Sequence, residues 1–384
     1  MKKKWVTYTV FTIVLTLGLV GGSWSTSLAQ GTIPPAPPAP EPAPPLIGAI
    51  VTAGIGHSCS ITPTTGLRCW GLNDSGQVGD ATFEDKLVST PVEDPPALDI
   101  VDLQSGIKHT CALTSGGRVF CWGLNDKGQI GDGTNENRNT PVWVEGIAGV
   151  VEEISAGAKF TCAKTTADRI FCWGENNAGQ LNDGTTEDKN VATQVDYDLV
   201  DNVLQLSGGM RELQGITFNG VFNFWNLEPQ IPVTGLEELE HRILSADRFF
   251  EGGCQTTKDK EVECWGAIVD ADVTDATLDK RFLDSGGGHA CTIDARGLVC
   301  WGNNSDGQLG DESFVDSEDA VVVVEAGDIA DLAAGLNHTC VVYTKRPDAS
   351  GEVPYSLTKC WGDNTYGQVG NNTLEDVNKP VYVH

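Results

Sequence analysis

Apolar residues recur at every second position over short stretches of this chain, and each stretch ends at a Gly-containing turn. In the clearest case the alternation covers residues 111–113 before the turn and 119–121 after it. A period of two is that of a half-buried β-strand, and two such stretches around a short turn predict a hairpin. Short apolar runs at 100–103 and 142–144 flank this hairpin. The pattern therefore predicts a unit of up to four strands.

The same unit recurs along the chain, anchored each time by a tryptophan that is usually followed by glycine. Successive anchors are 36 to 60 residues apart, and they are Trp70, Trp122, Trp173, Trp225, Trp265, Trp301 and Trp361. Four strands repeated at this spacing are typical of propeller blades, and a closed ring leaves no exposed sheet edge. We therefore predict an all-β, seven-bladed β-propeller over residues 46–384. Because the chain ends on a strand-like segment, we also expect residues 379–383 to pair into the first blade and close the ring.

Composition supports many short strands and limits the class of partner. Glycine provides 45 of the 384 residues, well above the usual share of about 7%, which fits many tight turns and argues against a helical bundle. The formal net charge is −28. Binding to nucleic acid or to anionic lipid requires a basic surface. We therefore expect no nucleic-acid partner and no adhesion to membranes.

The N-terminal segment has the pattern of a secretory signal peptide. Three lysines at 2–4 precede an apolar stretch at 5–22, and the small residues Ser27 and Ala29 suit a cleavage site after residue 29. An uncleaved membrane anchor is the alternative, although the stretch is short and rich in threonine for a spanning helix. Residues 30–45 are Pro-rich and predict an extended linker. We therefore expect a secreted or cell-surface protein with residues 1–29 removed and no membrane insertion afterwards.

The twelve cysteines form six sequence pairs, and each pair flanks one hairpin turn. The pairs are Cys59 and Cys69, Cys111 and Cys121, Cys162 and Cys172, Cys254 and Cys264, Cys291 and Cys300, and Cys340 and Cys360. Opposed positions on antiparallel strands are close enough for a disulfide. The fourth unit lacks both cysteines, with Leu213 and Phe224 near the equivalent places. Because zinc sites and redox sites use shorter Cys spacings, we predict six structural disulfides, no metal, and an oxidising compartment.

The order of residues in each unit resembles the repeat of the regulator of chromosome condensation family. The shared pattern is A/S-G-x-x-H-T-C followed by W-G-x-N-x-x-G-Q-x-G-D, and it extends over roughly residues 46–384. Units four and five depart from it, at 207–225 and 252–266. The resemblance implies a seven-bladed propeller.

Members of that family have different activities, so the resemblance does not fix the function. A nuclear exchange factor that binds chromatin does not suit a secreted, acidic chain. A plant ultraviolet photoreceptor uses tryptophan in a G-W-R-H motif, where this chain has Gly56-His57 and Lys108-His109. Secreted bacterial members include propellers that inhibit β-lactamases, and these fit the expected compartment.

Four histidines occupy one repeat position, two residues before a cysteine. They are His57, His109, His289 and His338. A ring of imidazoles could bind a metal or support catalysis. Phe160, Arg211 and Gly252 stand at this position in the other units, and a metal ring would tolerate them poorly. We therefore expect a hydrogen bond within each blade.

The turns at 73–80, 125–134 and 304–311 are rich in Asp, Asn and Gly. Calcium loops use such oxygen ligands, but the terminal Glu and the spacing of an EF-hand are missing. Asn, Asp and Gly also form tight turns without an ion, so calcium stays an open alternative. The catalytic motifs G-x-S-x-G and H-E-x-x-H are absent, and we expect no catalysis and no cofactor.

We therefore predict a monomeric protein-binding module that acts as an interaction or inhibitor-like scaffold for an extracellular protein. The alternatives are an extracellular enzyme acting on glycans and a purely structural surface protein. Recognition by exposed loops is expected because the scaffold fixes their positions. Candidate partner-binding residues lie where repeat symmetry breaks, and they are Arg346, Tyr355, Arg242, Arg248, Phe249 and Phe250.

Overall fold

The structure of the chain is a computed structural model. It describes residues 49–93, 99–195, 203–217, 220–223, 229–231, 244–246, 252–256, 261–266, 268, 271–273, 282–325, 329–345 and 355–384. These residues belong to one compact unit, Pro44–His384. The predicted signal peptide at 1–29 and linker at 30–45 lie outside the described residues.

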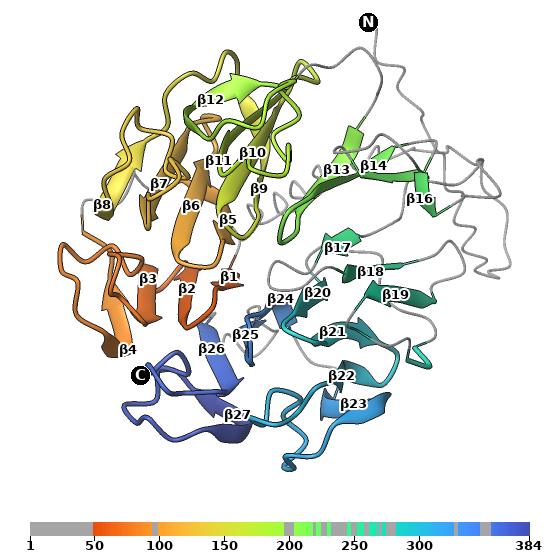
Figure 1. Cartoon of the computed structure of the whole chain (residues 1–384). Coiled ribbons are helices and arrows are strands. Elements are labelled where there is room, and N and C mark those ends of the chain that lie inside the picture. The colour runs from red at the N-terminus through yellow and green to blue at the C-terminus, as the bar shows by residue number, and fades with distance from the viewer. Residues whose placement is uncertain are drawn as a thin grey trace, which may run out of the picture. The chain divides into compact units, whose positions relative to one another are not determined.

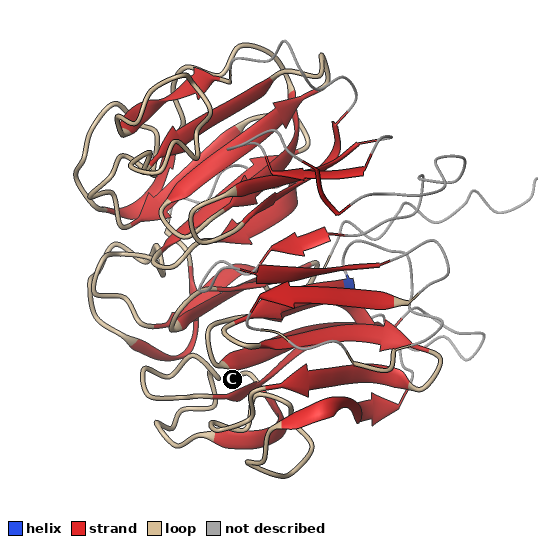
Figure 2. Cartoon of the chain, turned by 45° about the vertical axis from the view of Figure 1, so that its right-hand side comes forward, coloured by secondary structure: helices blue, strands red, loops and turns tan. Residues whose placement is uncertain are grey.

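Strands provide the regular structure of the described residues (Figure 2), and within each sheet a strand pairs with the next one in the chain. The first three sheets contain β1 (Ile50–Ala53), β2 (His57–Thr62), β3 (Gly66–Gly71) and β4 (Lys86–Pro91); β5 (Ile100–Ser105), β6 (His109–Thr114), β7 (Val119–Gly123) and β8 (Arg138–Trp143); and β9 (Val151–Ala156), β10 (Phe160–Thr165), β11 (Ile170–Gly174) and β12 (Lys189–Gln194). The fourth and fifth contain β13 (Val203–Gly208), β14 (Leu213–Thr217), β15 (Gly220–Asn223) and β16 (Pro229–Ile231); and β17 (Leu244–Ala246), β18 (Gly252–Thr256) and β19 (Val262–Gly266). The last two contain β20 (Leu283–Gly286), β21 (His289–Asp294), β22 (Gly297–Gly302) and β23 (Ser317–Glu325); and β24 (Ile329–Ala334), β25 (His338–Lys345), β26 (Tyr355–Gly362) and β27 (Val377–Tyr382).

The sheets form an all-β propeller, as predicted, but not seven equal blades. Six sheets have four antiparallel strands, and the sheet of β17, β18 and β19 has three among the described residues. The described residues thus form six complete blades rather than the predicted seven. Figure 1 shows the sheets arranged around a common centre. The innermost strand of each sheet contacts the innermost strand of the next, and β24 contacts β1.

The prediction that residues 379–383 complete the first blade is wrong. Strand β27 pairs with β26 of its own sheet, where Val381 lies opposite Cys360. The outer position of the first sheet is already occupied by β4, whose Thr90 lies opposite Cys69. Each blade is therefore built from one continuous segment of chain.

The hydrophobic core lies between neighbouring blades rather than inside any one of them. Trp122 of the second blade, for example, belongs to one buried cluster with Leu67 and Val78 of the first. The equivalent tryptophans Trp70, Trp173, Trp301 and Trp361 are likewise completely buried. A blade exposes a hydrophobic face when alone, so packing against both neighbours stabilises it.

All six predicted disulfides are present, and the described residues contain no free cysteine. In each, the two cysteines are direct partners on the two strands of one hairpin, as in Cys111 and Cys121. The fourth blade corrects one expectation. Its strand register places Gln214 opposite Asn223, so these residues, rather than Leu213 and Phe224, replace the cysteine pair.

The described residues include no helix that is both long and apolar enough to cross a membrane.

Candidate functional site

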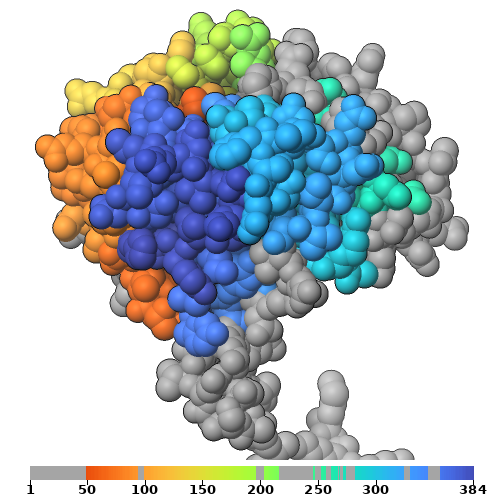
Figure 3. All heavy atoms as spheres, turned by 90° about the horizontal axis from the view of Figure 1, so that it is seen from below, coloured from red at the N-terminus to blue at the C-terminus, as the bar shows by residue number. Residues whose placement is uncertain are grey.

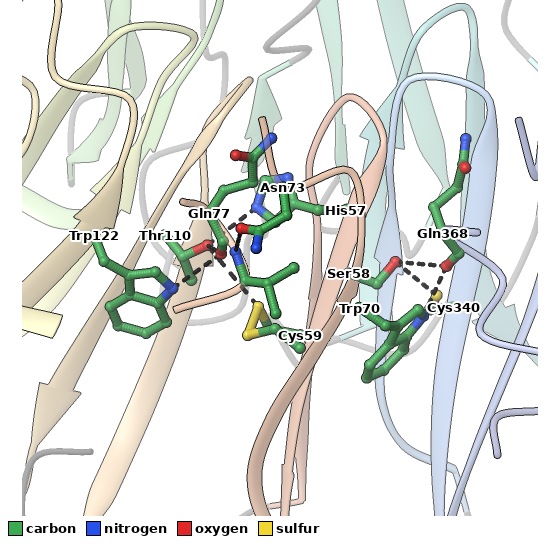
Figure 4. Close-up of a disulfide and its surroundings, with 12 residues drawn as sticks. His57, Ser58, Cys59, Trp70, Asn73, Gln77, Thr110, Trp122, Cys340 and Gln368 are labelled. Carbon is green, nitrogen blue, oxygen red and sulfur yellow. Dashed lines mark hydrogen bonds between the residues drawn. A yellow bond between two sulfur atoms is a disulfide. The ribbon is translucent and has the colours of Figure 1, made fainter. Parts of the chain in front are cut away.

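The row of histidines joins neighbouring blades. His57 Nε2 lies 3.0 Å from Thr110 Oγ1 of the second blade, and His109 Nε2 lies 2.9 Å from Thr161 Oγ1 of the third (Figure 4 shows the first blade and its neighbours). His289 contacts Thr339 in the same way at 3.0 Å. The expected hydrogen bond within a blade is therefore wrong. The residue after each histidine faces the preceding blade. The histidine of one blade therefore meets the hydroxyl residue of the next blade at the seam, which is the interface between the two blades.

The seventh and first blades are joined by the same contact. His338 Nε2 lies 2.9 Å from the hydroxyl of Ser58, which takes the place that Thr110 has in the second blade. The seam between the seventh and first blades therefore uses the same chemistry as the three His–Thr seams.

At the seam between the third and fourth blades an apolar pair replaces the polar one. Phe160 takes the histidine position, and Leu213 takes the threonine position; both are completely buried in one cluster. The backbone bond from Gly209 N to Glu212 O matches that from Gly157 N to Phe160 O. Glu212, rather than Arg211, is therefore the fourth-blade residue at the histidine position.

Glycine in the A/S-G-x-x-H motif makes room for the ring. A Cβ atom at Gly54 would lie 2.2 Å from Cε1 of His57, and one at Gly106 would lie 2.1 Å from Cε1 of His109. Both distances are far below any contact between real atoms. Each imidazole ring thus packs directly against the backbone of a glycine.

The buried histidines are poorly suited to acid–base chemistry. Burial, and next the charge of His338, lowers the pKa of His289 to about 3. Burial also lowers the pKa of His338 to about 4, against partly opposing effects of Asp363 and the His57 backbone. Both rings are neutral at physiological pH and completely buried, so they cannot exchange protons with a substrate in solvent.

A second contact across the seams explains the tryptophan anchors. The indole Nε1 of Trp122 donates to the carbonyl of Gln77 in the first blade at 2.9 Å. Trp70 donates to Gln368 at 2.8 Å. Trp173 and Trp361 donate to Gln129 and Gln308. These four W-G strands are therefore fixed to the G-Q turn of the preceding blade.

The Asn- and Asp-rich turns are organised by hydrogen bonds of their own. Asn125 Oδ1 accepts from Ile130 N at 2.9 Å, while its Nδ2 donates to oxygens of Asp132, Thr134 and Glu136. Asp132 also accepts from Thr134 and from Arg138. The sequence left calcium binding as an alternative for these turns. In the structure, turn oxygens that a cation would need accept hydrogen bonds from side-chain and backbone donors. Within the described ranges no three His, Cys, Asp or Glu side chains are grouped to hold a metal ion.

These donors also set the charge of the turn carboxylates. Burial by itself raises the pKa of Asp132, but hydrogen bonds from Thr134 and Arg138 hold that pKa below its ordinary value. The pKa values of Asp80 and Asp183 are lowered for the same reasons. Lys86 is the cation beside Asp80, and Lys189 is the cation beside Asp183. The turns therefore stay charged and structured at neutral pH.

The innermost strands surround a channel of 310 Å³ with several carboxylates in its wall. These carboxylates hold the ring together. Asp331 accepts from Val51 N at 2.9 Å, and Asp284 accepts from Ala334 N at 2.9 Å, each across a seam. The inner edge of an innermost strand has no neighbouring strand to accept hydrogen bonds from its backbone amides. A side chain from the adjacent blade accepts them instead.

The predicted partner-binding residues are only partly within the described ranges. Tyr355 lies at the start of β26 and is 44% exposed. The other five candidates lie outside the described residues and stay predictions. They are Arg346, Arg242, Arg248, Phe249 and Phe250.

The sequence reasoning missed a set of exposed apolar side chains at the tips of the G-Q-x-G-D turns. Phe83, Phe314 and Leu374 occupy one repeat position and are each at least half exposed. Asn135 and Thr186 take this position in the second and third blades. Aligning the turns by repeat position would have revealed the difference.

Comparison with known proteins shows which repeat family these units match. The model of the regulator of chromosome condensation (RCC1) repeat matches residues 69–113 and 116–163, and a second model of the same repeat matches 100–129 and 151–180. Residues 69–180 of the chain therefore match the RCC1 repeat. The resemblance inferred from the A/S-G-x-x-H-T-C and G-Q-x-G-D patterns is thereby confirmed.

The match to this chain covers very different shares of the relatives' own lengths. The ultraviolet-B receptor UVR8 of Arabidopsis thaliana is 25% identical over 89% of this chain and 82% of its own length. The human E3 ubiquitin-protein ligase HERC2 is 25% identical, but the match spans 47% of this chain and 4% of that protein. Among solved structures, the ectodomain of the receptor kinase CR4 from Physcomitrella patens has a TM-score of 0.50 and 17% identity, covering 82% of this chain and 72% of that one. This last likeness concerns the fold alone.

Proposed function

We propose that this RCC1-repeat protein is a secreted or surface-displayed propeller that binds an extracellular protein and catalyses no reaction. One observation carries the proposal. The reactive side chains that the repeats place in register, histidine and cysteine, are used inside the seams and hairpins, whereas large apolar side chains are exposed on loops. A rigid scaffold with exposed apolar loops suits recognition.

The proposed ring has seven units, with the three-stranded sheet as the fifth. Strand β17 contacts β13 of the fourth blade and β20 of the sixth, which supports a place between them. The proposed domains are the signal peptide at 1–29, the linker at 30–45 and the propeller at 46–384.

An extracytoplasmic setting is supported by the six disulfides, which are compatible with an oxidising compartment. The formal net charge of −28 favours a soluble monomer, because like-charged copies repel one another.

A glycan-cleaving enzyme is the second candidate, since carboxylates line the central channel. Paired carboxylates are the usual catalytic groups of glycosidases. Asp284 and Asp331, however, bind backbone amides across the seams, which favours a structural role over a catalytic one. A purely structural surface protein is the third possibility, and it would bind no partner.

The test is a binding experiment on the full chain in its oxidised form. The immobilised protein is exposed to extracellular fractions, and each retained protein is purified and titrated back by calorimetry. A saturable one-to-one complex is expected, and deletion of residues 344–357 tests the hairpin predicted to contribute. The absence of any saturable partner, together with turnover of a glycan library, would refute the proposal.

A further inference from the structure

One face of the propeller is polar over some blades and apolar over others. This turn face carries the G-Q-x-G-D turns, at residues 72–85, 124–137, 175–188, 303–316 and 363–376. At the tip position the second and third blades have Asn135 and Thr186, whereas the first, sixth and seventh have apolar residues. Those three blades are consecutive in the ring, because β20 contacts β24 and β24 contacts β1. Figure 3 shows their residues side by side.

Five exposed side chains on these three blades form what we call the turn-face patch. Its members and exposed fractions are Phe83 at 52%, Phe314 at 50%, Val315 at 71%, Tyr366 at 41% and Leu374 at 55%. Tyr366 lies against the first blade, because a Cβ atom at Gly56 would be 2.9 Å from its ring. The patch thus continues across the seam between the seventh and first blades. Exposed apolar side chains gathered on one face are a feature of interaction surfaces.

The charges beside the patch differ from those at equivalent places elsewhere. At the seam between the second and third blades Lys127 Nζ lies 3.1 Å from Asp188. The turn hydrogen bonds identify the equivalents at the seam between the sixth and seventh blades. Asp306 N donates to Gln308 as Lys127 N donates to Gln129, and Asp376 accepts from Asn364 N as Asp188 does from Asn176 N.

At this seam, therefore, a carboxylate stands where the other seam has an ammonium group. Asp306 faces Asp376, and Asp363 adds a third negative charge. Burial raises the pKa of Asp306 above its ordinary value. The hydrogen bond from Ser305 opposes this shift, and the charges of Asp363 and Asp376 add to it, as expected for like charges held close together.

Other cations of the turn face are missing from the sixth and seventh blades. Lys108 and Lys159 bridge to Asp74 and Asp126 across the first two seams, at 2.6 and 2.8 Å. Their equivalent in the seventh blade is Asn337. The strand position that holds Lys86, Arg138 and Lys189 in the first three blades holds Ser317 in the sixth and Val377 in the seventh, as the pairing with Gly302 and Gly362 shows.

We propose that the turn-face patch, together with Asp306, Asp363 and Asp376, is the docking surface for a basic segment of a partner protein. The segment carries lysine or arginine, which neutralises the three carboxylates, flanked by apolar residues that cover the patch. This inference rests on the proposed function and names the surface and the chemistry of its partner.

The charge argument selects this occupant over two others. A second copy of this chain would bring another large negative charge to an acidic surface, and an anionic membrane would be repelled in the same way. A cation of the partner placed among these three carboxylates gains attraction and relieves their repulsion.

Two peptides of twelve residues are the probes, with anisotropy on the full, oxidised chain as the measurement. One alternates arginine with leucine and phenylalanine; the other has glutamate for each arginine. The basic peptide should bind at 50 mM salt and weaken at least tenfold at 500 mM, because screening removes the electrostatic part. The acidic peptide should not bind.

Matched variants locate the surface. Asp306→Lys copies the arrangement that the second–third seam already has, so the fold is preserved, and affinity should fall about tenfold, or 1.4 kcal/mol. Phe314→Ser with Leu374→Thr gives the tips a polar character and should have a similar effect. The control Lys127→Asp alters the equivalent place beside polar tips and should leave affinity unchanged.

The outcomes separate this inference from the proposed function. If the protein binds a purified partner but the patch variants bind it equally well, the docking surface is wrong and the function stands. If no protein or peptide binds, both fail. If light scattering shows a dimer that Phe314→Ser with Leu374→Thr dissociates, the occupant is a second copy and the basic segment is excluded.

Discussion

The contact between His109 and Thr161 offers the sharpest test of how the blades are joined. The imidazole Nε2 and the threonine Oγ1 are 2.9 Å apart, and both residues are completely buried. At the next seam Phe160 and Leu213 take the two places. The protein therefore already contains both a polar and an apolar version of this joint, so exchanging one for the other should be possible only as a pair.

The expected magnitudes follow from which atoms lose a partner. Thr161→Leu leaves the buried Nε2 of His109 without its partner, which costs about 1–3 kcal/mol of unfolding free energy. His109→Phe should cost less, because Thr161 Oγ1 keeps its hydrogen bond to the carbonyl of Gln129 at 3.4 Å. The double variant recreates the Phe160–Leu213 joint and should lie within about 1 kcal/mol of the native protein. The coupling energy should therefore be about 1–2 kcal/mol.

The assay is guanidinium unfolding followed by tryptophan fluorescence, with the disulfides kept oxidised. The four proteins of the cycle are compared with Thr193→Val on an outer strand, where the half-buried hydroxyl bonds only to the nearby Val191 carbonyl. That control should shift the unfolding free energy by about 0.5 kcal/mol or less. If the double variant is no more stable than Thr161→Leu alone, the two residues do not act as an exchangeable pair and the reasoning fails.

Three further predictions concern the scaffold. Gly106→Ala should destabilise the fold by roughly 2 kcal/mol or more, because the new Cβ would lie 2.1 Å from His109 and 2.5 Å from the Gly157 carbonyl; Gly116→Ala, with its nearest atom 3.8 Å away, should be nearly neutral in the same thermal melts. Asn125→Ala should cost about 2–4 kcal/mol, since several turn hydrogen bonds depend on that amide, and an unchanged denaturation midpoint would contradict the role given to the turn. Acid should weaken the ring: the pKa values of His289 and His338 lie at about 3 and about 4, below the unfolded value of about 6.5. Stability is thus complete above pH ~6.5 and is lost as pH falls toward the folded values, so denaturation midpoints measured from pH 7 to 4 should decline, less steeply after His289→Phe.

The sequence was informative wherever the relevant partners lie within one unit. Cys111 and Cys121 are 10 residues apart, so hairpin symmetry alone was enough to pair them. His109 and Thr161 are 52 residues apart, and periodicity does not show which residues of two neighbouring units meet. For this reason the histidine contact was placed within the blade.

The ring closure was missed for a related reason. A terminal strand such as β27 fits the outer edge of either adjacent blade by its hydrophobic pattern, and only pairing geometry decides between them. The turn-face patch was missed because the search for binding residues favoured broken repeats, whereas the patch lies within the most regular ones. There the signal is a change of polarity at Phe83, Phe314 and Leu374 in an otherwise unchanged motif.

The continuity of each blade has a consequence for how such a protein can change over evolutionary time. Among the described residues no sheet takes a strand from the other end of the chain, and the joint of Ser58 with His338 resembles the three other polar joints. A gene segment that encodes one unit could therefore be duplicated, deleted or exchanged without cutting through a sheet. The first unit of the propeller is first only in chain order, and linking residue 384 to the start of that unit while opening another linker should give a circularly permuted propeller with the same fold.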